Sequence, residues 1–168
     1  VEMASTGEVA CFGETLQAAF LKAMISVGFK LPKKNILLTI GRLEDKVDFL
    51  ASARRLHELG YTLFATEGTS KFLTQNGIKN TMVAKVGKKK GPNILDHISK
   101  KKVDLVIDIP KNYTRQEITD GYMIRRNAID MNIPLITNVQ VAKLIVDVLQ
   151  RYTIEDLEIK SWDEYMKR

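Results

Sequence analysis

The sequence is poor in the side chains that metal sites and covalent catalysis use. Its 168 residues include one cysteine, Cys11, and two histidines, His57 and His97. A single cysteine cannot form an internal disulfide, and the chain has no Cys-x-x-Cys pair or Cys/His cluster that could hold zinc. We therefore expect no metal site in this chain. Such cysteine usage is typical of a reducing, intracellular compartment.

Long apolar runs are also absent. No stretch approaches the roughly 18 uninterrupted apolar residues that crossing a bilayer takes, so we predict no membrane span. With 45% hydrophobic and 27% charged residues, the composition is ordinary for a globular protein and argues against disorder. The length suits one domain of roughly 100–150 residues plus a flanking piece.

The net charge of +6 favours anionic partners such as phosphorylated metabolites, nucleic acid or an acidic protein surface. Nucleic acid is disfavoured, because the sequence has no zinc finger, no aromatic ribonucleoprotein motif and no arginine-rich helix. The lysine runs at 88–90 and 100–102 fit a solvated loop and a helix end as well as they fit a binding surface.

Five short, β-branched-rich apolar runs alternate with helical patterns along most of the chain. The runs are ILLTI (36–40), YTLFA (61–65), NTMVA (80–84), VDLVIDI (103–109) and IPLI (133–136). The helical patterns lie at 45–59, 69–76, 92–100, 118–131 and 138–150. This alternation predicts an α/β fold, a five-stranded parallel sheet with helices on both faces.

The two ends of the chain fall outside this alternation. Residues 14–27 carry a helical apolar stripe, Gly28 can end that helix, and 31–35 read as a short basic linker. A lone helix cannot bury such a stripe, so we expect it to pack on a part outside this chain. Residues 152–168 form a polar extension with Trp162 as a candidate packing anchor.

Basic and hydroxyl side chains follow three of the predicted strands. Lys46 comes after the first, Thr66, Gly68 and Thr69 after the second, and Lys85 after the third. Ligands of open parallel sheets bind beyond the carboxyl ends of the strands, and a helix N-terminus binds anions readily. Together these residues predict an anion pocket at that edge of the sheet.

Each of these residues also has a plain structural interpretation. Lys46 could be a tolerated surface lysine, and Thr69 or Ser70 could simply cap a helix. The fourth and fifth strands deliver Asp108 and Thr137 to the same edge. No Ser/His/Asp or Cys/His set can be assembled, no phosphate-binding loop of the ATPase type is present, and both histidines fall in helical patterns, where we expect structural roles.

Several stretches of the chain resemble the methylglyoxal-synthase-like domain, and within it the version that closes the large subunit of carbamoyl phosphate synthetase. They are ATEGTS (65–70), VAKVGKKKGPNILD (83–96), VDLVIDIP (103–110), YMIRRNAID (122–130) and IPLITNVQVAKL (133–144). The upstream EMASTGEVACFG (2–13) is similar to the tail of that subunit's second ATP-grasp half. The resemblance covers nearly the whole chain.

This resemblance implies a Rossmann-like sheet and an allosteric role without catalysis in this fragment. Members controlled by nucleotide monophosphates hold the phosphate with residues that correspond to the predicted pocket: Lys46, Thr66, Gly68, Thr69 and Lys85. The family usually has asparagine at the position of Asp108. A carboxylate that faces a phosphate is unfavourable unless Lys46 or Lys85 neutralises it.

The resemblance also implies domains and partners. Residues 1–30 would be a remnant of the preceding synthetase half, 31–35 a linker, 36–151 the regulatory domain and 152–168 an extension. The implied partners are an anionic effector, the synthetase domains of the same subunit, a glutaminase small subunit and further copies in an oligomer. The parent enzyme would use ATP with Mg or Mn to make carbamoyl phosphate from bicarbonate and glutamine or ammonia, for arginine and pyrimidine synthesis. The fragment itself would hold no cofactor, and the location would be cytoplasmic or, in a eukaryotic arginine pathway, mitochondrial.

Other ligands known for the family match less well. N-acetylglutamate sites use a tryptophan and asparagines, where this chain has Lys85, Asp108, Lys111 and Gly121. Ornithine sites use a hydroxyl after the fifth strand, which Thr137 supplies without the usual tyrosine neighbour.

Two alternative functions remain open. One is a methylglyoxal-synthase-type lyase acting on dihydroxyacetone phosphate, whose catalytic aspartate aligns with Gly91 and whose histidine is missing from 113–118. The other is a structural or oligomerisation domain without an effector.

Overall fold

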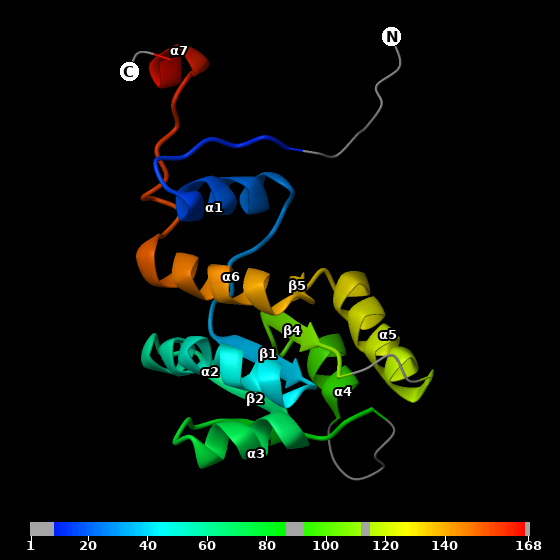
Figure 1. The fold of residues 1–168 in the computed structure, drawn as a ribbon. Coiled ribbons are helices and arrows are strands. Elements are labelled where there is room, and N and C mark those ends of the chain that lie inside the picture. The colour runs from blue at the N-terminus through cyan, green and yellow to red at the C-terminus, as the bar shows by residue number, and fades with distance from the viewer. Residues whose placement is uncertain (1–8, 87–92, 112–114, 167–168) are drawn as a thin grey trace.

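The computed structural model describes residues 9–86, 93–111 and 115–166, and its centre is a five-stranded parallel sheet (Figure 1). The strands are β1 (Asn35–Ile40), β2 (Thr62–Thr66), β3 (Thr81–Val83), β4 (Leu105–Ile109) and β5 (Leu135–Ile136). Their order across the sheet is β3-β2-β1-β4-β5. All five strands lie within or beside the apolar runs of the sequence, so the predicted fold class is confirmed.

Helices cover both faces of the sheet. They are α1 (Leu16–Ser26), α2 (Leu43–Glu58), α3 (Glu67–Gln75), α4 (Ile94–Ser99), α5 (Arg115–Asp130), α6 (Val139–Arg151) and α7 (Trp162–Met166). Side chains of α2, α3 and α6 share one core with one face of the sheet. Side chains of α4 and α5 share a second core with the other face. This two-sided cover explains why the central strands are apolar almost throughout.

The position of a ligand crevice follows from the strand order. From β1 the chain moves outward to β2 and β3, and then returns to the other side of β1 to form β4 and β5. The connections through α2 and α3 therefore lie on one face, and those through α4 and α5 lie on the opposite face. Beyond the carboxyl ends of β1 and β4 the chain continues to helices on opposite faces of the sheet, and in open sheets of this kind a ligand crevice lies at this point of reversal.

The N-terminal helix packs within the chain. Leu21 of α1 is fully buried, and Figure 1 shows α6 between α1 and the sheet. Gln17 Nε2 of α1 donates a hydrogen bond of 2.7 Å to Asp147 Oδ2 of α6. The expectation that this helix packs on something outside the chain is therefore corrected, because α6 offers it an apolar surface. Gly28, with φ of +84°, lies just beyond the helix end, as predicted.

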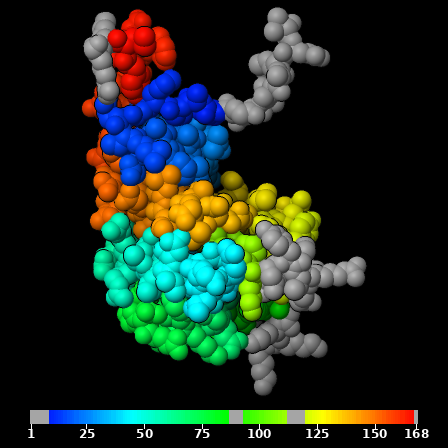
Figure 2. All heavy atoms as spheres, viewed as in Figure 1, coloured from blue at the N-terminus to red at the C-terminus, as the bar shows by residue number. Residues whose placement is uncertain are grey.

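The C-terminal extension returns to the N-terminal segment. The Trp162 and Phe12 rings meet edge-on with centroids 5.5 Å apart, and the Tyr165 hydroxyl donates to the Phe12 carbonyl at 3.2 Å. Figure 2 shows the two segments together at the end of the molecule away from the sheet. Trp162 thus makes a packing contact while its side chain stays largely exposed. The extension therefore lies against the N-terminal segment and is not part of the core.

A close backbone contact joins the loops that follow β1 and β4. The Gly41 N–H donates to the Ile109 carbonyl at 2.8 Å. A Cβ atom at position 41 would lie 2.3 Å from the backbone nitrogen of Lys111, closer than any real contact. Only glycine fits there, so this residue sets how closely the two loops approach.

We expect Gly41→Ala to lower the free energy of unfolding by about 1–3 kcal/mol, the usual range for overpacking. Gly68→Ala is the matched control, because the nearest atom to its added Cβ, Lys46 Nζ, lies 3.7 Å away. Urea unfolding of both variants measures the difference. Equal stability of Gly41→Ala and the unchanged protein would contradict the contact.

Candidate anion-binding site

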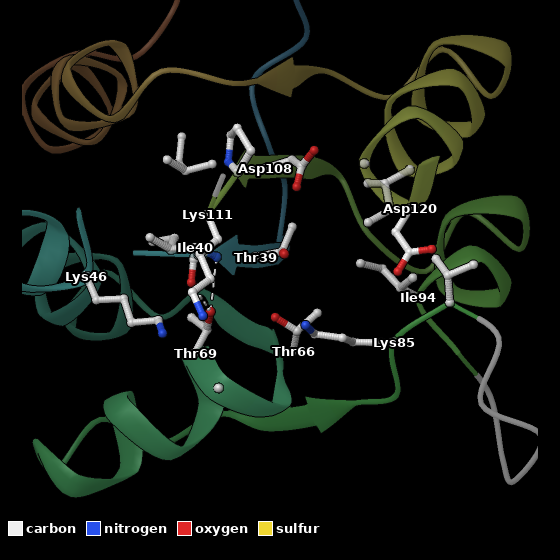
Figure 3. A pocket seen from close by; sticks show the side chains of 17 residues that line it. Thr39, Ile40, Lys46, Thr66, Thr69, Lys85, Ile94, Asp108, Lys111 and Asp120 are labelled. Carbon is white, nitrogen blue, oxygen red and sulfur yellow. Dashed lines mark hydrogen bonds between the residues drawn. The ribbon is translucent and has the colours of Figure 1, made fainter. Parts of the chain in front are cut away.

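A cavity of roughly 230 Å³ lies at the carboxyl edge of the sheet, where the fold places the crevice (Figure 3). Six of the seven residues predicted from the sequence line it: Lys46, Thr66, Gly68, Thr69, Lys85 and Asp108. Thr137 is exposed after β5 and is not among the lining residues. The site therefore gathers residues from β1, β2, β4 and the segment after β3, but not from β5.

Lys46 reaches from the first turn of α2 toward the N-terminus of α3. Its Nζ would lie 3.7 Å from a Cβ atom at Gly68, so the ammonium group sits over a position that has no side chain. Burial lowers the pKa of Lys46, and the positive charges of Lys111 and Lys85 lower it further. These three cations therefore repel one another across the cavity. A bound anion would relieve that repulsion.

Thr69 holds two elements of the site together. Its hydroxyl accepts from the Ile40 N–H at 3.0 Å and donates to the Ile40 carbonyl at 3.1 Å, and the residue is almost fully buried. Both bonds fasten α3 to the end of β1 (Figure 3). The Thr69 hydroxyl is thus committed to the backbone and serves to position the start of α3.

The N-terminus of α3 faces the cavity without a side-chain cap. The helix begins at Glu67, and its N-cap residue, Thr66, makes no capping hydrogen bond. The interpretation of Thr69 or Ser70 as a simple helix cap is therefore wrong, since both lie inside the helix. First-turn N–H groups that no side chain caps, with the positive end of the helix dipole, form a ready site for an anion.

Lys85 and Lys111 are exposed lysines at the mouth of the cavity. The strand end before Lys85 is fixed by a bridge between Ala84 and Asn93, in which the Ile94 N–H donates to the Ala84 carbonyl at 3.0 Å. Lys111 follows β4 and was not selected from the sequence as a site residue. Its place directly after a strand was the signal that could have identified it.

Asp108 is the buried carboxylate of the site. It lies opposite Thr39 in the pairing of β1 with β4 and is 4% exposed. Its Oδ2 accepts a hydrogen bond of 3.2 Å from Arg125 Nη1. Neither Lys46 nor Lys85 forms an ion pair with this carboxylate among the described residues, and its charged partner is Arg125 of α5.

Burial and Arg125 act on Asp108 in opposite directions. Burial raises the pKa of Asp108, the charge and hydrogen bond of Arg125 lower it, and the result is a pKa of about 6. Gly121 leaves room for this arginine, since a Cβ there would lie 2.7 Å from its Nη1. The spacing of Gly121 and Arg125 by one helical turn is the sequence signal for this arrangement. Asp120 of α5 also lines the cavity and was missed from the sequence.

Other chemistry finds little support in the described part of the chain. No group of three His, Cys, Asp or Glu side chains there could hold a metal ion. His97 packs against Phe64, with ring centroids 5.1 Å apart, and burial lowers its pKa. Among the same residues no helix has the length and apolar character to cross a membrane.

The sequence of this chain is similar to a known domain family and to several much longer proteins. A sequence model of the MGS-like domain matches residues 48–137. Multifunctional protein pyr1-3 of Dictyostelium discoideum is 47% identical over 154 residues, which cover 89% of this chain and 7% of that protein. Carbamoyl-phosphate synthase (ammonia), mitochondrial, of Homo sapiens is 47% identical over 154 residues, covering 89% of this chain and 10% of that protein. Multifunctional protein URA2 of Saccharomyces cerevisiae is 42% identical over 160 residues, which cover 90% of this chain and 7% of that protein.

The chain therefore spans a tenth or less of the length of these relatives. Among solved structures, methylglyoxal synthase from Elizabethkingia anophelis superposes with a TM-score of 0.52 at 18% identity, covering 83% of this chain and 97% of that one. This likeness concerns the fold alone.

The buried carboxyl predicts how stability depends on pH. Because the pKa of Asp108 is higher in the folded protein, about 6, than its ordinary value of 3.8, protonation favours folding. That contribution is complete below pH 3.8 and is lost as the pH rises through 6. Two pKa units correspond to about 3 kcal/mol. We expect the free energy of unfolding, relative to Asp108→Asn, to fall by about that amount between pH 4 and 7.

Urea unfolding of both proteins at each pH measures this difference. Equal urea dependence of the two proteins is the control, because it shows that both unfold from equally compact states. A difference that stays constant across this pH range would contradict the raised pKa.

Proposed function

Since this chain belongs to the MGS-like domain family, we propose that it is the allosteric domain of a carbamoyl phosphate synthase-type protein and binds an anionic effector in the cavity. The observation that carries the proposal is the gathering of Lys46, Lys85 and Lys111 around one cavity. Within residues 9–86, 93–111 and 115–166, none of the three has an ion-pair partner. Folding alone gains nothing from this arrangement, since the lysines repel one another.

A phosphate monoester fits the site better than a lone carboxylate. The three ammonium groups and the uncapped first turn of α3 offer more donors than one carboxylate can use, and phosphate presents three acceptor oxygens. Lys85, Asp108, Lys111 and Gly121 stand where N-acetylglutamate sites have tryptophan and asparagines. We therefore infer a nucleotide monophosphate as the effector.

Regulation follows if the effector favours one arrangement of this domain relative to its neighbour. Coupling between two sites is typically about 1–3 kcal/mol. In the proposed protein the neighbour is the preceding synthetase half, of which residues 1–30 are the tail, with 31–35 as a linker, 36–151 as the regulatory domain and 152–168 as an extension. The great length of the relatives supports further domains in the same chain.

The wider role is part of the same proposal. The parent protein would make carbamoyl phosphate from bicarbonate, glutamine or ammonia, and ATP, with Mg or Mn bound outside this fragment and a glutaminase partner. It would act as an oligomer in the cytoplasm, or in the mitochondrion, as the name of the human relative indicates for that protein. The fragment itself would bind the effector and catalyse nothing.

A route from the cavity to the N-terminal segment supports this proposal. Asp48, half a turn beyond Lys46 on α2, accepts hydrogen bonds from Gln140 and Lys143 of α6. Asp147 of α6 in turn accepts from Gln17 of α1. Helix α2 thus touches both the candidate effector and the helix on which α1 rests.

The lyase alternative receives support from the fold alone, through the likeness to a methylglyoxal synthase. The positions where its catalytic groups would stand, Gly91 and 113–118, fall where the structure describes no side chains. Incubation with dihydroxyacetone phosphate distinguishes the two functions, and we expect no methylglyoxal.

We expect Lys46→Ala and Lys85→Ala each to weaken binding of uridine or inosine monophosphate by about 1.5–3 kcal/mol, the range for hydrogen bonds to charged groups. Titration calorimetry measures the affinities. Lys71→Ala is the matched control, because Lys71 lies on α3 but pairs with Glu67 outside the cavity. Unchanged affinity in both cavity variants would place the effector elsewhere, and absence of binding to the unchanged protein would favour a structural domain.

We further expect effector binding to slow amide hydrogen exchange in α1 as well as in α2. Asp48→Ala, which removes the two hydrogen bonds that α6 donates to Asp48 but leaves the apolar packing of α2 on α6, should weaken the effect on α1 and leave that on α2. Glu44→Ala removes a carboxylate from the same helix and serves as the control. Exchange in α1 that ignores a bound effector would contradict this route.

A further inference from the structure

The amino edge of the sheet, opposite the cavity, carries a cluster of lysines. Two lie directly before β1, one precedes β3, and three lie between α4 and β4. They come from three distant stretches of the sequence, and the sheet brings them to one edge because all its parallel strands begin there. All six are exposed, and we call them the amino-edge lysines: Lys33, Lys34, Lys79, Lys100, Lys101 and Lys102.

Hydrogen bonds hold two of these stretches side by side. Asn35, at the start of β1, donates from Nδ2 to the Lys102 carbonyl at 2.9 Å. The N–H groups of Lys34 and Asn35 both donate to Asp104 Oδ2, each at 2.8 Å. The backbones that carry Lys34 and Lys102 are therefore fixed next to each other, and their ammonium groups extend into solvent from adjacent points of the edge.

The stability of the fold does not account for this cluster. Among the residues that the structure describes, no amino-edge lysine has an ion-pair partner. The negative end of the α4 dipole favours Lys100, which is its C-cap, but Lys33 and Lys34 lie directly before a strand rather than at a helix end. Like charges gathered on one surface repel one another and favour binding of a negatively charged partner.

The chemistry of the edge favours carboxylates over nucleic acid. None of the six side chains is an arginine, whose planar guanidinium is preferred for the phosphates of nucleic acids. Single-stranded nucleic acid also stacks its bases on exposed aromatic rings. Tyr61, the aromatic residue directly before β2 at this edge, is partly buried, and its hydroxyl donates to the Pro32 carbonyl at 3.4 Å.

The strand order gives the length of the surface. The lysines stand before β3, β1 and β4, and β2 lies between the first two of these strands. Three spacings of about 4.8 Å between neighbouring strands give a row of roughly 14 Å. An extended polypeptide of about four or five residues covers this length.

From this arrangement we propose that the amino-edge lysines form a docking surface for an acidic, extended polypeptide segment of a partner protein. The segment would cross the amino ends of the strands from β3 to β4, and its carboxylates would pair with the ammonium groups. This surface lies at the opposite edge of the sheet from the effector cavity, so the inference does not depend on the proposed function. Charge complementarity of this kind selects the partner and speeds association.

Fluorescence anisotropy with a labelled peptide of ten glutamates tests this proposal on the whole chain. We expect Lys34→Gln/Lys102→Gln to bind the peptide about three- to tenfold more weakly at low salt, because two surface ion pairs are lost. The affinity of the unchanged chain should fall as salt is added, and that of the variant should fall less steeply. Lys101 is left in place, because its φ of +49° would make a substitution there a test of backbone strain as well.

Two control variants locate the peptide. Lys71→Gln/Lys143→Gln removes the same charge from α3 and α6, where both lysines already pair with carboxylates, and should change the affinity less than twofold. Lys46→Ala, in the effector cavity, should likewise retain the affinity for the peptide. If the control pair weakens binding as much as the amino-edge pair does, or if Lys46→Ala weakens it more, the proposal is wrong.

Other anionic probes identify the class of partner. We expect a labelled ten-residue oligouridylate and vesicles of phosphatidylcholine with phosphatidylserine to bind more weakly than the peptide, and tighter binding of either would overturn the assignment to an acidic protein. Sedimentation velocity of the chain alone tests a second copy as the occupant. We expect no self-association that depends on the amino-edge lysines, and self-association that Lys34→Gln/Lys102→Gln abolishes would refute a separate partner.

Discussion

The parallel pairing of β1 with β4, and the backbone contact just beyond it, determine the geometry of the cavity. The register sets Thr39 opposite Asp108 and carries both strands to the same edge. Past that edge Gly41 lies against Lys111, because glycine alone can approach so closely. The start of α2, which carries Lys46, is thereby held close to the segment that carries Lys111. Thr69 adds a third element, since its hydroxyl binds both backbone polar groups of Ile40. The cavity is thus a consequence of main-chain packing, and its charges are arranged on a rigid frame.

The charges on this frame are only partly compensated by the protein. Asp108 is buried and forms an ion pair with Arg125. Lys85 and Lys111 at the mouth are exposed to solvent, so they tolerate the lack of an ion-pair partner among the described residues. Water screens the repulsion among exposed ammonium groups, so the fold can hold them together at small cost. A phosphate that replaces this water gains attraction in a less polar environment. Burial of Asp108 destabilises its charged form, so its pKa lies at about 6 although Arg125 lowers it.

Sequence reasoning located the site because parallel strands end at one edge. Lys46, Thr66 and Lys85 follow different strands, and the topology alone brings them together. It could not assign the partner of Asp108, because Arg125 lies 17 positions further along and reaches the carboxylate only after α5 has packed on the sheet. It also treated Thr69 as a ligand or a cap, whereas its hydroxyl is used in a tertiary contact. Thr137 was grouped with the site because β5 ends at the same edge, yet this strand lies at the end of the sheet, beyond β4.

The packing of α1 bears on how an effector could act at a distance. In an isolated helix the apolar stripe at 14–27 has no surface to pack against, and the sequence does not show that α6 provides one. In the folded chain α6 contacts α2 on one side and α1 on the other. Helices packed in this way shift as units, because their interiors are too dense to deform locally. Coupling requires a two-state element that both sites bias. A displacement of α2 on anion binding, if one occurs, would reach α1 by way of α6, because α6 contacts both helices.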